Sequence, residues 1–219
     1  MIRSRVRSPL CLAIVVTVSL IAGGCTSGSS HREQYFILEA ARRGDPLQPV
    51  SDGSLSVHRF TVDAAFAAKN MVYRLDEFKY EADYYRQFLI SPGVMITEKT
   101  RDWLAASGLF CTVLPSGSRV VPAHMLEGNV TALYGDFTSE SAPTAVMEIR
   151  FFLLGNAAGA DRVVFSRSYR AACAVPSRTT PDFIDAMNRS LADILTRLEA
   201  DLAQALAAKA DATGNATGR

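Results

Sequence analysis

The side chains able to carry catalysis or to bind a metal are few and scattered. The three histidines, His31, His58 and His124, never stand in H-x-x-x-H or H-E-x-x-H spacing, the spacing that places two zinc ligands on one helix face. We expect them at the surface or at strand edges. Neither a G-x-S-x-G elbow nor a phosphate-binding glycine motif occurs. Cys111 and Cys173 lie among apolar residues, which favours unreactive thiols over nucleophiles. The sequence therefore predicts no catalytic residue, no metal site, no cofactor, and a protein that is not an enzyme.

The first 24 residues carry the clearest functional signal. Arginines at positions 3, 5 and 7 precede an uncharged stretch from Pro9 to Gly24. This stretch is short for a bilayer span, so residues 1–24 are predicted to be a signal peptide. Small residues directly before Cys25 resemble a bacterial lipobox, although Ala22 stands where leucine is usual. In a lipobox Cys25 becomes the acylated first residue; the alternative is an ordinary signal peptide with an incidental cysteine.

Residues 25–33 are rich in serine and glycine, which predicts a lipidated flexible tether. Each buried CH₂ of an acyl chain contributes about 0.8 kcal/mol, and more than one chain makes anchoring stable. Thr26 occupies the position where aspartate retains enterobacterial lipoproteins in the inner membrane. We therefore expect a lipid-anchored protein of the outer membrane whose domain faces the periplasm.

Cys111 and Cys173 would be the two cysteines that remain outside the signal peptide and the lipid anchor. In an oxidising compartment such a pair can form a disulfide. That bond would close a loop of about 60 residues and contribute roughly 4 kcal/mol in the chain-entropy model. Two separately buried thiols are the alternative, and the sequence leaves both open.

Charge and hydrophobic patterning indicate the fold class. The chain has 23 basic and 22 acidic residues, a balance that argues against nucleic-acid binding. Alternating runs at 125–137, 146–154 and 163–175 predict an antiparallel meander, and 71–75 with 78–81 predict a hairpin. Ser91-Pro92 and Gly108 bound one amphipathic helix, and a second of about 28 residues follows Thr180. We predict a single α+β domain over residues 34–209, a mostly antiparallel sheet with two helices on one face, and a disordered tail over 210–219.

One aromatic cluster has no obvious role in the core. It comprises Tyr80, Tyr84, Tyr85 and Phe88. Aromatic side chains are enriched at protein interfaces, and they are equally normal where a helix seals a core. Both readings stay open, and this segment is our candidate for a partner-facing edge.

Taken in order, several short motifs bear a likeness to one family. After the signal and lipobox come Tyr35-Phe36-x-Leu38, Leu55-x-Val57-x-x-Phe60, Val72-Tyr73-Arg74, Tyr84-Tyr85, Ser91-Pro92, and Trp103-Leu104 through Gly108-Leu109-Phe110-x-x-Val113. Together with the long C-terminal helix they resemble the ABC-type transport auxiliary lipoproteins, which are partners of Mce-type and paraquat-inducible (Pqi) intermembrane lipid-transport systems. The resemblance covers about residues 10 to 205. Family members usually have a tryptophan shortly before the proline, where this chain has Phe88.

The resemblance implies a non-enzymatic accessory or docking component. Its partners would be an MCE-domain protein and the ABC permease and ATPase of a lipid-transport system, and copies of the chain would form a homo-oligomer. An envelope assembly or maintenance lipoprotein without lipid transport is the alternative, and a lipid-anchored hydrolase is a further one.

Overall fold

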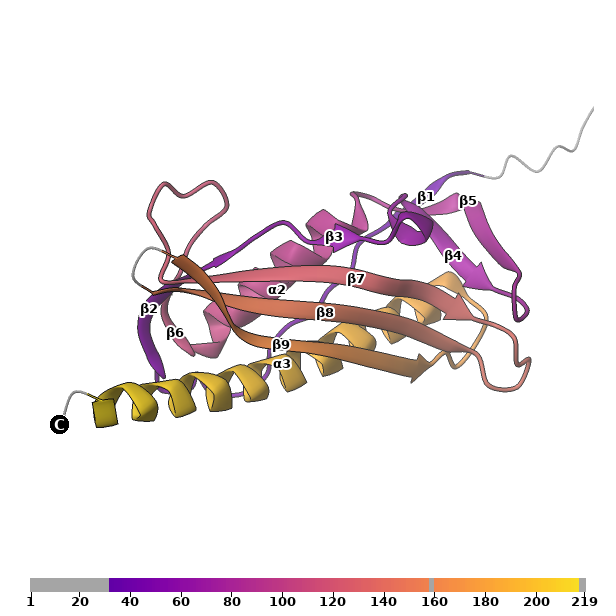
Figure 1. Cartoon of the computed structure of the whole chain (residues 1–219). Helices are drawn as coiled ribbons and strands as arrows, with labels where there is room; N and C mark the ends of the chain where they lie inside the picture. The colour runs from indigo at the N-terminus through magenta and orange to yellow at the C-terminus, as the bar shows by residue number, and fades with distance from the viewer. Residues whose placement is uncertain (1–31, 158–159, 217–219) are drawn as a thin grey trace, which may run out of the picture. The chain divides into compact units, whose positions relative to one another are not determined.

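Alternating apolar and polar residues in the second half of the chain build the three longest strands. They pair antiparallel as β7 (His124–Asp136), β8 (Thr144–Ala157) and β9 (Ala160–Ala174), which confirms the predicted meander (Figure 1). The structure is a computed structural model that describes residues 32–157 and 160–216. The signal peptide, Cys25, most of the tether and residues 217–219 lie outside the described residues.

Strand β7 is the centre of the sheet because the short N-terminal strands also attach to it. Within the described residues, β7 pairs in parallel with three of them: β2 (Ser51–Val57), β3 (Thr61–Val62) and β4 (Asn70–Arg74). The predicted hairpin is confirmed, because β4 pairs antiparallel with β5 (Tyr80–Phe88). Two edge strands join in parallel: β1 (Gln34–Phe36) on β5 and β6 (Phe110–Val113) on β2. The sheet is therefore mostly but not purely antiparallel, and the parallel joins were not predicted.

Helix α2 (Pro92–Ser107) begins and ends where the sequence predicts. Ser91 is its N-cap residue and Pro92 its first residue, although the Ser91 hydroxyl makes no capping hydrogen bond. Gly108 ends it with φ of 71°, in the left-handed region that glycine adopts most easily. A Cβ at this position would lie 2.7 Å from the Leu47 carbonyl oxygen, so the crossing N-terminal segment also requires glycine there.

Helix α3 (Thr180–Ala216) is longer than predicted. The Thr179 hydroxyl accepts a hydrogen bond from the Asp182 amide at 3.4 Å at its start. The helix continues through most of the segment predicted as a disordered tail, and this corrects that prediction. The sequence after Leu206 has no apolar periodicity, but it is rich in alanine, which has the highest intrinsic helix propensity. This propensity favours continuation of the helix. A short 3₁₀ turn, η1 (Ala64–Phe66), completes the helical elements of the described residues.

Both α-helices pack on the same face of the sheet, as predicted. Their buried side chains belong to one core cluster with the inward-facing residues of β7, β8 and β9. Members of this cluster that are fully buried include Ile96, Leu104, Phe151, Met187 and Leu198. Fully burying such a side chain contributes about 1.5–3 kcal/mol. This shared core fixes α2 and α3 against the meander.

A bulge in β7 divides the core. Val130 pairs with Ile149 but Ala132 pairs with Glu148, so Thr131 is an extra residue. An extra residue reverses the side-chain alternation of a strand. After the bulge, Ala132 and Tyr134 point to the outer face, away from the helices. There they form a second, smaller cluster with Val72, Val146 and Phe66.

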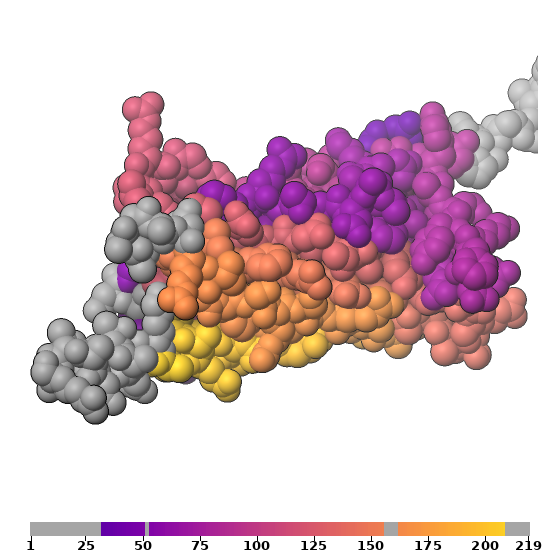
Figure 2. Space-filling view, in the orientation of Figure 1, coloured from indigo at the N-terminus to yellow at the C-terminus, as the bar shows by residue number. Residues whose placement is uncertain are grey.

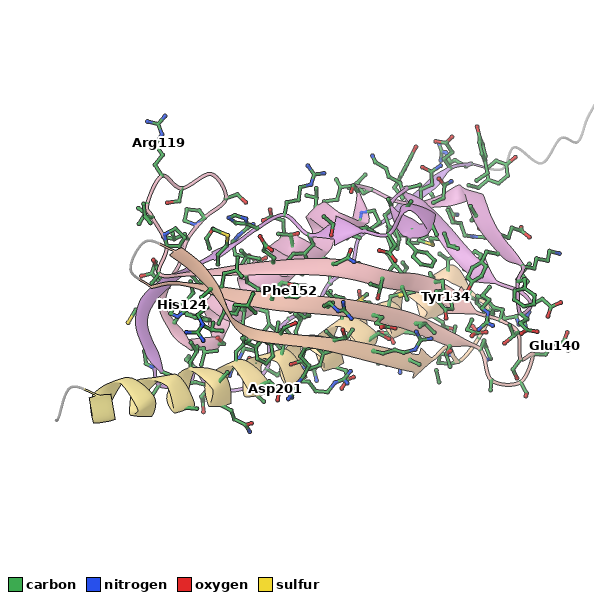
Figure 3. All side chains as sticks on the ribbon, viewed as in Figure 1. Arg119, His124, Tyr134, Glu140, Phe152 and Asp201 are labelled. Atoms are coloured by element: carbon green, nitrogen blue, oxygen red, sulfur yellow. The ribbon has the colours of Figure 1, made fainter. Side chains whose placement is uncertain are left out.

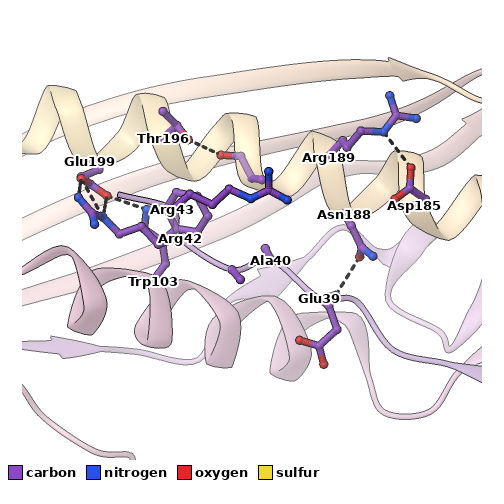
Figure 4. A pocket seen from close by; sticks show the side chains of 12 residues that line it. Glu39, Ala40, Arg42, Arg43, Trp103, Asp185, Asn188, Arg189, Thr196 and Glu199 are labelled. Carbon is purple, nitrogen blue, oxygen red and sulfur yellow. Dashed lines mark hydrogen bonds and ion pairs between the residues drawn. The ribbon is translucent and has the colours of Figure 1, made fainter. Parts of the chain in front are cut away.

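The N-terminal segment is held by a buried ion pair (Figure 4). The Arg42 guanidinium donates to Glu199 of α3 at 2.9 Å, and the two side chains are 8% and 12% exposed. The indole N–H of Trp103, on α2, donates to the same carboxylate at 2.8 Å. One carboxylate thus connects the N-terminal segment, α2 and α3.

The predicted disulfide is not formed, because the register places the two cysteines at opposite ends of the sheet. Both are free thiols; Cys111 on β6 is exposed and Cys173 on β9 is half-buried. Cys173 pairs with Ala145, near the start of β8. Cys111 lies near the other end of β8, because the successive pairings from β6 through β2 and β7 lead to Gly155. Ten residues of β-strand span roughly 33 Å, and a disulfide needs a Cα separation of about 6 Å.

Removal of Glu199 should destabilise the fold strongly. Glu199→Ala leaves Arg42 buried without a counter-charge, and breaking such a pair costs about 3–5 kcal/mol. Asp193→Ala is the control, because it breaks the exposed Arg197–Asp193 pair, which is worth about 0.3–0.5 kcal/mol. Urea denaturation measures both variants, and equal midpoints would contradict the role given to Glu199.

Candidate functional site

A wide bulge in β5 presents two tyrosines to solvent. Val72 of β4 pairs with Ala82, but Asn70, two residues away, pairs with Gln87. Between these two pairings β5 has four residues, 83–86, where β4 has only Met71. We call the four residues Asp83 to Arg86 the tyrosine bulge. Bulges of this kind redirect side chains at sheet edges.

Asp83 builds the bulge. Its Oδ1 atom accepts the backbone N–H groups of Tyr85 and Arg86, each at 2.9 Å. Its Oδ2 atom accepts the Arg86 guanidinium at 2.9 Å, and its carbonyl accepts the Asn70 amide at 2.8 Å. A short acidic side chain can satisfy nearby backbone donors in this way in place of a strand ladder.

Tyr84 and Tyr85 both have exposed side chains. Tyr84 is 67% exposed and Tyr85 40%. Their ring centroids are 5.1 Å apart in an edge-to-face arrangement, a geometry that aromatic pairs prefer.

Edge strand β1 enlarges this exposed surface. The backbone N–H of Leu89 donates to the Phe36 carbonyl at 2.8 Å, so the segment after β5 stays beside β1. The Tyr35 hydroxyl donates to the Glu33 carboxylate, and this hydrogen bond raises the pKa of Tyr35. We define the aromatic edge as six exposed residues: Tyr35, Ile37, Tyr84, Tyr85, Leu89 and Ile90. A clustered set of exposed apolar side chains of this kind marks an interaction site.

The four aromatic residues selected from sequence have three different environments. Tyr84 and Tyr85 lie on the aromatic edge. Tyr80, 47% exposed, packs edge-to-face against Phe66 and Tyr134 on the outer face. Phe88 is 2% exposed and belongs to the core, so it is not part of an accessible surface. The sequence did not identify Tyr35, Ile37, Leu89 and Ile90, although Leu89-Ile90 directly before the helix cap was a visible signal.

A groove of about 650 Å³ lies between the N-terminal segment, α2 and α3 (Figure 4). Apart from Arg43, its polar side chains are already paired within the protein. Glu199 is held by Arg42 and Trp103, the Asn188 carbonyl accepts the Glu39 amide, and Arg189 pairs with Asp185. These bonds explain the groove as part of the structural connection between the segments.

The described residues contain no group of three or more His, Cys, Asp or Glu arranged to hold a metal ion. His124 begins β7 and is only 9% exposed, which corrects the expectation of a surface histidine; it packs against the Phe110 ring. None of the helices that the structure describes is long and apolar enough to cross a membrane.

The fold matches solved structures at low sequence identity. No family model and no curated protein matches the chain. Protein XCC0632 from Xanthomonas campestris, described with the family model DUF330, superposes with a TM-score of 0.68 at 18% identity, covering 82% of this chain and 99% of that one. The fold is one already seen in a bacterial protein. A second structure, of an uncharacterized protein, gives a TM-score of 0.57 at 13% identity and covers 78% of this chain and 99% of that chain. Identities this low establish a shared fold alone.

Removal of the two exposed tyrosines should leave the fold intact. Tyr84→Ala with Tyr85→Ala changes surface side chains, so we expect the free energy of unfolding to change by about 0.5 kcal/mol or less for each. Phe88→Ala is the matched control on the same strand, and loss of a buried phenylalanine costs about 3–5 kcal/mol. Thermal and urea denaturation measure the difference. A double variant as unstable as Phe88→Ala would place the tyrosines in the core.

Proposed function

We propose that this protein is a lipid-anchored envelope lipoprotein that acts by docking and not by catalysis. Cys25 is its acylated residue, in the outer membrane, and the domain faces the periplasm. The observation that carries the proposal is that the lipobox-like sequence at Cys25 leads directly into β1, whose exposed Tyr35 belongs to the aromatic edge. The tether from Thr26 to Gln34 reaches roughly 30 Å when extended, so the aromatic edge stays close to the membrane.

We further propose that the docking partners belong to an intermembrane lipid-transport system. The family resemblance of the sequence supports an MCE-domain protein with its ABC permease and ATPase as partners, and it supports association of the chain into a homo-oligomer. The likeness to XCC0632 supports the fold part of this proposal. In this role the aromatic edge supplies binding energy through a few large anchors, as Tyr and Trp do at protein interfaces.

Lipidation is tested at Cys25. In cells grown with an alkyne-labelled palmitate, the wild-type chain should be labelled and fractionate with the outer membrane. Cys25→Ala should lose both properties, because no other position follows the lipobox-like sequence. Cys111→Ala is the matched control and should stay labelled. Label retained by Cys25→Ala would exclude this anchor.

The docking role is tested by co-purification from native membranes. The wild-type chain should recover an MCE-domain protein. The double variant Tyr84→Ala with Tyr85→Ala should recover at least about tenfold less of that partner, because two interface anchors are lost. Phe78→Ala, an exposed aromatic at the other end of the β4–β5 hairpin, should have no effect. Recovery of a stable complex without any transport component would instead favour an envelope assembly or maintenance role.

A further inference from the structure

The outer face of the sheet carries half-buried and exposed apolar side chains at the end where β7 begins. Met125, Leu154 and Val163 lie side by side across β7, β8 and β9, and Phe152 is in the adjacent row. Their chain neighbours Leu126 and Leu153 are fully buried on the helix side, so this row faces outward. Neither core cluster of the described residues includes any of the four. Val163 is 53% exposed.

The loop that leads into β7 adds two more exposed apolar residues at the same end. Val120 and Val121 are 59% and 77% exposed, and the loop stands out from the surface in Figure 2. Arg119 lies at its tip (Figure 3). We define the distal patch as Val120, Val121, Met125, Phe152, Leu154 and Val163.

A cavity borders the patch and the surrounding charge is basic. The cavity measures about 240 Å³ and is lined by His58, Arg59, Glu127 and Phe152 among others. Arg59, Arg119 and Arg150 have no ion pair within the described residues. Two acids lie among them: Glu127 lines the cavity, and Asp63 accepts a hydrogen bond from Asn129 of the same lining. The surroundings therefore complement a ligand with negative charge beside an apolar stripe.

The distal patch is separate from the aromatic edge. Asp136, at the other end of β7, pairs with Arg74 of the β4–β5 hairpin, and twelve residues of strand span roughly 40 Å. Apolar residues across three strands cover about 10 Å, which is the diameter of an α-helix with its side chains. A cavity large enough for one side chain fits a protein ligand better than a membrane surface.

We propose that the distal patch binds an amphipathic helical segment of a partner protein, with apolar residues on one face and acidic residues beside them. The apolar face lies across Met125, Leu154 and Val163, and one acidic side chain enters the cavity beside Arg59. This surface extends the docking role proposed above. Its test uses no transport component and no lipid label, so the two proposals fail separately.

The test uses the purified full chain in solution and two synthetic helical peptides. Both peptides carry leucines at i, i+4 and i+7; one has glutamates on the flanks and the other lysines. Fluorescence anisotropy should show binding of the glutamate peptide only. Val163→Glu should weaken it at least about tenfold, and Tyr84→Glu, at the aromatic edge, should leave it unchanged. Arg59→Glu with Arg150→Glu should reverse the preference toward the lysine peptide.

Three results would overturn the proposal. Equal binding of both peptides would show unspecific apolar contact, and binding unaffected by Val163→Glu would place the peptide elsewhere. The third result combines two observations: neither peptide binds, and the chain co-sediments with added phosphatidylglycerol vesicles unless Val121 is replaced by Glu. That result would assign the patch to an anionic membrane. Each variant should stay folded because the substituted side chains are exposed, and circular dichroism checks this.

Discussion

The buried carboxylate of Glu199 is the constraint on which the arrangement depends. A charge removed from water is tolerated only with full compensation, and here the compensation comes from Arg42 and Trp103, which belong to two other segments. The ion pair and the Trp103 hydrogen bond therefore form together only when the N-terminal segment, α2 and α3 are all in place. That requirement specifies one path for the residues between β1 and β2. The path determines where β1 joins β5 and where the chain leaves toward the predicted tether.

Local signals in the sequence were sufficient for the regular elements. Proline after Ser91 and glycine at 108 bounded α2, and period-two alternation located β7, β8 and β9. The parallel joins were not predictable in the same way, because β3 has two residues and its partner at Asn129 is 68 residues from Thr61. The disulfide prediction was wrong for a related reason. Strand membership alone says nothing about the level of Cys111 and Cys173 along the sheet.

Irregular positions, not the regular strands, decide which side chains are exposed. The bulge that Asp83 stabilises exposes Tyr84 and Tyr85, whereas Phe88, on the same strand, stays in the core. Thr131 reverses the faces of β7, so Tyr134 covers the outer side. Period-two reasoning assigns these residues to the wrong face once a strand contains extra residues. The aromatic cluster was therefore found from composition, but its division into surface and core was not. No partner-facing residue other than Tyr84 and Tyr85 was selected in advance from the aromatic edge.

The position of β7 also has a consequence for the order of folding. β2, β3 and β4 are made early in the chain, but each needs β7 as a neighbour, and each pairs with β7 residues that lie about 60 to 70 positions later. Contacts so distant in sequence require long loops to close first, which slows folding relative to proteins with local contacts. Until β7 arrives, the N-terminal strands expose unpaired edges that are prone to aggregation. A general chaperone that holds the chain extended through this interval would raise the yield of folded protein without contacting the native state.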